Sequence, residues 1–254
     1  MLIDTHAHLT DERYGGCGGI IANMKSDNLE KIITVGFDME SSDGAYEIAK
    51  NNADVYCAVG FHPCDVKKIK DGDLDRLLEI SRSDKCVAIG EIGLDYHYDD
   101  TDKRAQKKGL SQMFELVEAA DLPAVFHIRD ADGDMLAAVK ENISKFKKGG
   151  VVHCFSGSKE TALEYVDMGF YISFTGVITF RNAAKFPDII RALPKDRILV
   201  ETDCPFLAPP PHRGELNYPA YVRYQAEKIA EILGVGFDEV EKTTTENAHR
   251  LFGF

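Results

Sequence analysis

The 254-residue chain lacks long apolar runs and closely spaced cysteines. No run approaches the roughly 20 apolar residues that span a bilayer, which argues against a membrane protein. The six cysteines are scattered without a Cys-x-x-Cys pair, and the N-terminal residues carry no basic segment of the kind that opens a secretory signal. These absences favour a cytoplasmic protein with reduced thiols and no membrane association. We also expect a monomer.

Positive charge is scarce as well. The chain has 30 lysine and arginine residues against 42 aspartate and glutamate residues, which gives a formal net charge of -12. A general duplex-binding protein usually has a basic face, so this charge argues against one. It leaves open an enzyme that acts on one phosphodiester at a chain end, where the local charge of the site matters more than the overall charge.

Short apolar runs recur along the whole chain, with helical patterns between them. Most runs are rich in valine and isoleucine with little alternation, as strands buried on both faces are. The alternation predicts a single-domain (β/α)8 TIM barrel over residues 1–254, a usual length for this fold. A doubly wound open sheet is the alternative, but no Gly-x-Gly-x-x-Gly follows a strand. The eight runs span residues 2–5, 31–35, 55–59, 87–89, 124–127, 151–153, 171–174 and 198–201.

Residue types that bind metals follow these runs. Two histidines stand two positions apart at the first run, so both side chains point to one face of a strand. In a barrel the carboxyl ends of the strands meet at one face, where the chemistry gathers. A catalytic metal usually takes about three protein ligands and a water, so six candidate ligands suit two metals that share a carboxylate. The six are His6, His8, Glu91, His127, His153 and Asp203.

Glu91 is the natural bridge, because it lies between the two groups of strands. Two divalent cations against the carboxylates of Glu91 and Asp203 leave the site at about +2 on a simple count, which attracts a phosphodiester. Mixed imidazole and carboxylate ligands accept Zn, Mn, Fe, Co or Ni, whereas Mg binds histidine poorly and stays a weaker possibility. The glycine-rich residues 15–19 are expected to form a flexible loop after the first strand.

Several motifs connect these residues to a known family. They are DTHAHL at residues 4–9, GFHP at 60–63, GEIGLDY at 90–96, HIR at 127–129, HCFSG at 153–157, ETDCPFL at 201–207 and NAHRLF at 247–252. In this combination, which covers nearly the whole chain, the sequence resembles the TatD family of metal-dependent deoxyribonucleases within the amidohydrolase-like barrels. The resemblance implies two divalent metals and phosphodiester hydrolysis, with trimming of single-stranded DNA ends in the 3′-to-5′ direction.

The resemblance also assigns roles. His6, His8, Glu91 and Asp203 would hold one metal, and Glu91, His127 and His153 the other. Asp203 would also orient the attacking water and accept its proton. Two other reactions stay open: ester hydrolysis like that of a D-aminoacyl-tRNA deacylase, which would use the same metals, and amidohydrolase chemistry on a C–N bond. Many amidohydrolases bridge their metals with a modified lysine after the fourth strand, where this chain has Glu91.

Three further residues are candidates for contact with the substrate. His62 follows the third strand and is surplus to the six ligands, so it is a catalytic candidate that donates to a phosphate. The guanidinium of Arg129 matches phosphate oxygens, or it pairs with Asp95 or Asp130. Arg213 either contacts phosphate or orders its own loop.

Other residues of the motifs are expected to be structural. Tyr96 and Phe206 have faces on which a base stacks, but packing is the expected role of both. Alternation points Cys154 and Cys204 away from the metals, also into packing. Asn247 is expected to tie the last helix to the barrel.

Overall fold

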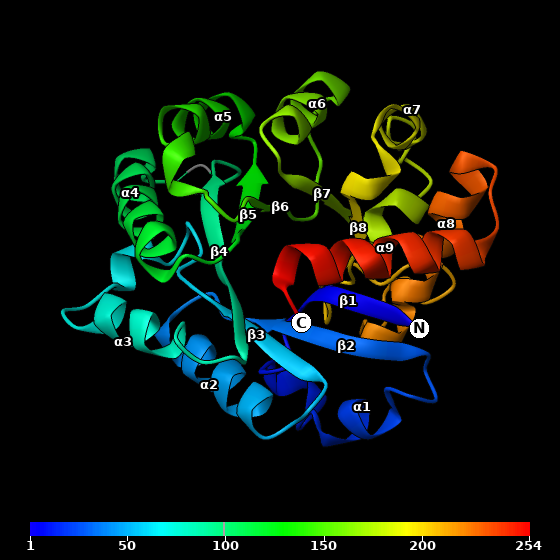
Figure 1. Ribbon diagram of the computed structural model, residues 1–254, viewed down its shortest axis with the longest axis horizontal. Helices are drawn as coiled ribbons and strands as arrows, with labels where there is room; N and C mark the ends of the chain where they lie inside the picture. Colours follow the sequence, from blue (N-terminus) through cyan, green and yellow to red (C-terminus); the bar gives the residue numbers. More distant parts are fainter. Residues whose placement is uncertain (99) are drawn as a thin grey trace.

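A computed structural model describes residues 1–98 and 100–254 of the protein. Its parallel strands form one eight-stranded sheet in sequential order. A bridge between Ala7 and Cys204 joins the two edges, so the sheet is a nearly closed barrel (Figure 1). This confirms the predicted (β/α)8 fold. The strands are β1 (Leu2–Ala7), β2 (Leu29–Val35), β3 (Val55–Val59), β4 (Cys86–Asp95), β5 (Ala124–Arg129), β6 (Gly150–Val152), β7 (Tyr171–Phe174) and β8 (Ile198–Val200).

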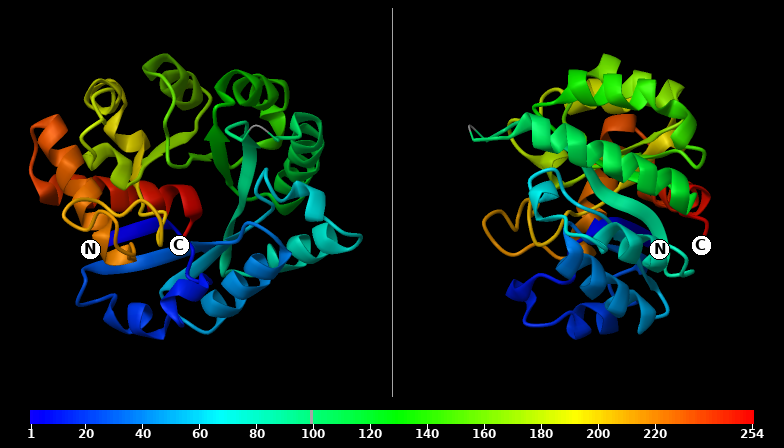
Figure 2. Two further views of the ribbon diagram at one scale, coloured as in Figure 1. Left: turned by 180° about the vertical axis from the view of Figure 1, so that it is seen from behind. Right: turned by 90° about the vertical axis from the view of Figure 1, so that its left-hand side faces the viewer.

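Helices surround the strands, and α9 lies across one end of the barrel (Figures 1 and 2). The α-helices are α1 (Gly18–Asn23), α2 (Met39–Lys50), α3 (Asp73–Ile80), α4 (Lys103–Ala120), α5 (Asp132–Glu141), α6 (Lys159–Asp167), α7 (Phe186–Ala192), α8 (Val222–Leu233) and α9 (Phe237–Phe252). Short 3-10 turns are η1 (Glu12–Tyr14), η2 (Val66–Lys68), η3 (Ile143–Lys145), η4 (Gly176–Thr179), η5 (Lys195–Arg197) and η6 (Pro219–Tyr221). The residues expected to form a glycine-rich loop therefore include the start of α1, which corrects that prediction. No described helix is both long and apolar enough to cross a bilayer.

The apolar core has two layers. One face of the strands packs against the helices, and the other fills the barrel interior, where Ile3, Ile33 and Val125 belong to the same cluster as Leu251 and Phe252 of α9. Helix α9 is held there by Asn247, whose Nδ2 donates to the carbonyl oxygens of Lys195 and Ile198, as expected. Because α9 closes the amino-terminal end of the strands, the carboxyl-terminal end is the one free to hold a site.

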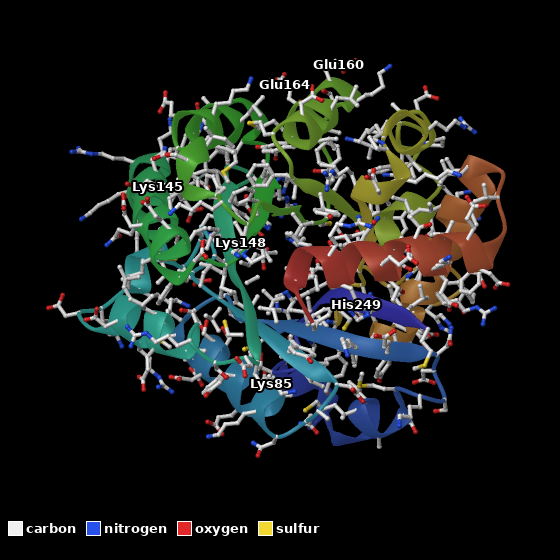
Figure 3. The ribbon with its side chains drawn as sticks, viewed as in Figure 1. Lys85, Lys145, Lys148, Glu160, Glu164 and His249 are labelled. Atoms are coloured by element: carbon white, nitrogen blue, oxygen red, sulfur yellow. The ribbon has the colours of Figure 1, made fainter. Side chains whose placement is uncertain are left out.

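Charged side chains cover the outside of this ring. Figure 3 shows Lys145, Glu160 and Glu164 on the outer helices, and Lys145 pairs with Glu115 and Glu118 at 2.9 and 2.7 Å. His249 of the last motif lies on α9, away from the carboxyl-terminal end of the strands, and its Nε2 is 2.7 Å from Oε1 of Glu30. This histidine is therefore structural.

Strand β4 is longer than the apolar run that predicted it. The run stops at Ile89, but pairing with β5 continues through Gly93–His127 and Asp95–Arg129. Glu91 thus lies inside the strand and not at its end. Gly93 has a φ of 153°, and a Cβ there would lie 1.8 Å from the carbonyl oxygen of His127, so only glycine lets the two strands approach this closely. This close approach sets His127 beside Glu91.

Candidate metal centre

The barrel brings all six predicted ligands to its carboxyl-terminal end. His6 lies in β1, His127 lies in β5, and His153 directly follows β6. Five of the six line one pocket of about 620 Å³. His6 does not line this pocket and is fully buried.

Glu91 stands between two groups of ligands. Its Oε1 lies 2.7 Å from Nδ1 of His127 and 2.8 Å from Nε2 of His153. Its Oε2 lies 3.5 Å from Nε2 of His6 and 3.9 Å from Nε2 of His8. The two oxygens of one carboxylate therefore face different pairs of histidines.

Asp203 completes the group around His6 and His8. Its Oδ1 lies 3.3 Å from Nε2 of His8 and 3.8 Å from Nε2 of His6. The backbone N–H of Asp203 donates to the carbonyl oxygen of His6 at 2.9 Å, which fixes this residue beside β1 although it comes from the loop after β8. Four sets of three described side chains have ligand atoms close enough for one cation. Two of these sets contain predicted ligands only: His6, His8 and Asp203, and Glu91, His127 and His153. The other two are His6, His153 and Glu201, and His62, Asp95 and His127.

The far sides of the imidazoles also suit metal binding. Nδ1 of His8 lies 2.9 Å from the carbonyl oxygen of Val35, and Nε2 of His127 lies 3.1 Å from Oδ2 of Asp95. Nδ1 of His153 lies 3.3 Å from Oε1 of Glu201, which is an ion-pair distance without hydrogen-bond geometry. Histidines that bind metals usually donate their second N–H to such a carbonyl or carboxylate, which leaves the other nitrogen free as a ligand.

His6 provides a separate test of whether these residues fit a metal ion. Both of its ring nitrogens are buried and make no hydrogen bond to the described residues. A buried polar atom without a partner is costly, and a cation bound at Nε2 would provide one. The donor set, four imidazoles and two carboxylates around a pocket, therefore fits divalent cations of the transition series.

The side chains of the cluster shift each other's pKa values. Burial alone would raise the pKa of Glu91, but His153 and His127 hold it well below its usual value. Burial would lower the pKa of His153, but the carboxylates of Glu91 and Glu201 raise it well above its usual value. Both shifts act in the direction that favours a protonated His153 beside an ionised Glu91 when no cation is bound.

Sequence reasoning missed Asp95 and Glu201 as members of this cluster. Each carboxylate lies behind a candidate ligand, and Glu201 also accepts a hydrogen bond from the backbone N–H of Cys154 at 2.6 Å. Both stand within the motifs that carry the family resemblance, which was the available signal. Two more carboxylates at the site cancel the excess positive charge of about +2 that was counted from sequence.

Asp4 was also missed. It is buried, and its Oδ2 accepts from the hydroxyl of Thr202 at 2.6 Å while its Oδ1 accepts from the backbone N–H of Thr202 at 2.9 Å. Burial raises the pKa of Asp4 to about 8. Asp4 thus joins β1 to the residues after β8 and fixes the positions of His6 and Asp203 relative to each other.

His62 lies at the edge of the cluster. Its Nδ1 accepts from the backbone N–H of Cys64 at 3.2 Å, and its Nε2 lies 3.9 Å from Oε1 of Glu91. Burial and the neighbouring His127 lower the pKa of His62 to about 4, so the ring is neutral at physiological pH. An accepting Nδ1 puts the single proton on Nε2, which makes His62 a hydrogen-bond donor into the pocket.

The two arginines differ. Arg129 lines the pocket and forms no ion pair with the described residues. The acidic partners considered from sequence are engaged elsewhere, Asp95 with His127 and Asp130 with His97 at 2.9 Å. Its charge is therefore available to a ligand.

Arg213 is not among the residues that line the pocket. Its Nη1 donates to the carbonyl oxygen of Ala208 at 3.0 Å, and its guanidinium lies 3.9 Å from the centre of the Phe180 ring. These contacts favour the interpretation that Arg213 orders its own loop.

Three expectations about packing have mixed outcomes. Cys204 is fully buried, as expected. Cys154 was expected to point away from the site but lines the pocket, because a φ of 45° just after β6 breaks the alternation of a strand. Phe206 was expected to pack, but it is 46% exposed at the pocket.

Comparison with known proteins agrees with this geometry. The family model for TatD related DNases matches residues 3–253. The chain belongs to the TatD family. It is 44% identical to the metal-dependent hydrolase YabD of Bacillus subtilis over 99% of both chains, and 36% identical to the metal-dependent hydrolase YcfH of Escherichia coli over 99% of this chain and 96% of that one. The protein is thus a TatD-family metal-dependent hydrolase.

Solved structures support the fold. The crystal structure of YJJV, a TatD homologue from Escherichia coli, matches with a TM-score of 0.94 and 30% identity, covering 100% of this chain and 98% of that one. An organophosphorus hydrolase from Deinococcus radiodurans matches with a TM-score of 0.64 and 13% identity, covering 99% and 92%. The second likeness extends the shared barrel beyond the family.

Proposed function

We propose that the protein is a two-metal phosphodiesterase that removes nucleotides from single-stranded DNA ends in the 3′-to-5′ direction. The observation that carries the proposal is the position of Glu91, whose two oxygens face two separate pairs of histidines. His6, His8 and Asp203 would hold one cation, His127 and His153 the other, with Glu91 shared. Zn, Mn, Fe, Co or Ni suit these donors better than Mg.

When bound, two such cations would activate a water and offset the charge of the phosphate. The side chains around them have complementary tasks. Burial would raise the pKa of Asp203, but the hydrogen bond with His8 and the charge of His6 hold it below its usual value, so Asp203 is ionised and able to accept the proton of the attacking water. The Nε2–H of His62 would donate to a phosphate oxygen, and the guanidinium of Arg129 would bind another.

The charge of the protein restricts the substrate. A net charge of -12 repels a long polyanion. With Asp95 and Glu201 included, the two-metal site has no net excess of positive charge either, so attraction must come from local contacts with one phosphate. A strand end offers that phosphate without laying a duplex along an acidic surface.

The test is digestion of short DNA by metal-free protein that has been reconstituted with one defined metal at a time. A 5′-labelled single strand should shorten stepwise, EDTA should stop the reaction, and added Mn or Zn should restore it. A strand with a blocked 3′ end is the matched control and should resist. Equal or faster cutting of closed circular duplex would contradict the proposal.

The same preparation should be offered D-aminoacyl-tRNA and a simple amide substrate. Preference for either over DNA would assign the site to the ester or C–N hydrolysis considered from sequence.

A further inference from the structure

Two exposed aromatic side chains share the pocket of the metal centre. Five large apolar side chains are exposed among the described residues, and Tyr98 and Phe206 are the two that line this pocket. Tyr98 is 53% exposed, and Phe206 is 46% exposed. A large aromatic ring left in water at a polar site is a surface for a ligand with an apolar face.

The two rings come from opposite sides of the barrel. Tyr98 lies in the loop after β4, and Phe206 lies in the loop after β8. In a ring of eight strands in sequential order, the fourth and the eighth are diametrically opposite. The pocket and the predicted ligands therefore lie between the two aromatic residues.

Each ring has an arginine at one face. The guanidinium of Arg13 lies 4.5 Å from the centre of the Phe206 ring, and that of Arg129 lies 5.7 Å from the centre of the Tyr98 ring. Arg13 is fixed by two hydrogen bonds to Asp11 at 2.8 and 2.7 Å. Arginines at this distance stabilise and orient an exposed ring, so neither aromatic side chain stands alone on its loop.

The two rings also have neighbours in different halves of the metal centre. The centre of the Phe206 ring is 6.1 Å from that of His8, in the group with Asp203. Tyr98 adjoins Arg129, and Arg129 is opposite Asp95 in the pairing of β4 with β5. Asp95 lies behind His127, which belongs to the other group. A phosphate held at Glu91 would thus have an aromatic ring on each side.

We propose that Phe206 and Tyr98 hold the two nucleobases that flank the scissile phosphate, one base stacked on each ring. The inference rests on the proposed nuclease function and deepens it. Every base has a flat π-face, so stacking on these rings tolerates any sequence. In a duplex the flanking bases stack on each other and are paired, so they cannot reach two separate rings. Selection for single-stranded ends then follows from the positions of two side chains.

Kinetics on DNA test the two positions separately. Phe206→Leu and Tyr98→Leu keep apolar bulk but remove the ring, and each should raise KM for a single-stranded oligonucleotide roughly tenfold while kcat changes less. Tyr218→Leu is the matched control, because Tyr218 is 37% exposed but does not line the pocket. It should leave KM within about twofold, since no stacking contact is lost.

Abasic substrates identify the base that each ring holds. An abasic residue on the 5′ or the 3′ side of the cleaved bond should reduce the increase in KM caused by one variant and not that caused by the other. If the increases in KM stay the same on abasic DNA, or if both depend on the same base, the two-sided arrangement is wrong.

Fluorescence separates this inference from the proposed function. The chain has no tryptophan, so 2-aminopurine placed on either side of the bond can be excited without a tryptophan background. Binding should quench it on both sides, and each variant should abolish quenching on one side. Quenching without cleavage would support the stacking role of the two rings and contradict the nuclease function. Cleavage without quenching or base dependence would support the nuclease function and contradict the stacking role.

Discussion

Nε2 of His127 lies 3.1 Å from Oδ2 of Asp95, on the side of the imidazole away from Glu91. Asp95 is itself buried and accepts from the backbone N–H of His97 at 2.9 Å. The carboxylate therefore orients His127, and a cation bound at Nδ1 would leave the Nε2–H to donate to Asp95.

Asp95→Asn should weaken metal binding by roughly 10- to 100-fold, because the amide supplies no negative charge to the imidazole. Glu201→Gln should have an effect of similar size through His153. Isothermal titration of the metal-free proteins with Zn or Mn measures both. An exposed acidic residue such as Asp188 provides the control, and Asp188→Asn should bind like the parent. Unchanged affinity in Asp95→Asn would show that this contact does not orient His127.

His62→Ala should reduce turnover while both metals stay bound. The Nε2–H of His62 points into the pocket from outside the two groups of three ligands, so its loss removes a donor to the phosphate and no metal ligand. We expect a fall in kcat on the order of 100-fold, the usual size for a positioned donor. Metal content measured on the same preparation decides the assignment, and loss of a cation would make His62 a ligand.

Metal binding should release protons at neutral pH. In the absence of cations, Glu91 and Glu201 raise the pKa of His153 well above its usual value, although burial opposes this. A cation needs the unprotonated ring, so apparent affinity should increase with pH until the raised pKa is passed. Calorimetry in two buffers of different ionisation enthalpy should give at least one proton released at pH 7. Equal heats in both buffers would contradict a protonated His153.

Much of the site could be predicted from sequence, because strand ends of a parallel barrel meet at one face. His6, His8, His153 and Asp203 lie where that rule puts them. Glu91 does not, because the rule ends a strand where the apolar run ends, and Gly93 lets β4 continue past it. The cytoplasmic location and the monomeric state stay predictions.

What sequence could not supply was contact between residues far apart in the chain. Asp95 and Glu201 act on histidines of other strands, and no local pattern distinguishes them from structural carboxylates. The rotation of Cys154 toward the pocket depends on one positive φ. The exposure of Phe206 depends on the course of the loop after β8, which periodicity does not describe.

Gly93→Ala should destabilise the fold strongly, by roughly 2–4 kcal/mol, because the added Cβ meets the His127 carbonyl at 1.8 Å and the φ of 153° disfavours any other residue. Denaturant unfolding followed by circular dichroism measures this. Gly133→Ala in α5 is the matched control. No heavy atom lies within 4 Å of its added Cβ, so its stability should stay within about 1 kcal/mol of the parent. Equal effects of the two changes would contradict the close approach of β4 and β5.

Glu91→Gln is the most direct test of a shared carboxylate. The substitution keeps size and packing but removes the negative charge that offsets repulsion between two nearby cations. The variant should fold with an unchanged circular dichroism spectrum and lose turnover on the order of a thousandfold.

The decisive measurement is the metal content per chain of gently purified parent and Glu91→Gln protein by elemental analysis. Two equivalents in the parent and one or none in the variant are expected. Two equivalents in both, with near-normal hydrolysis, would contradict a bridge at Glu91.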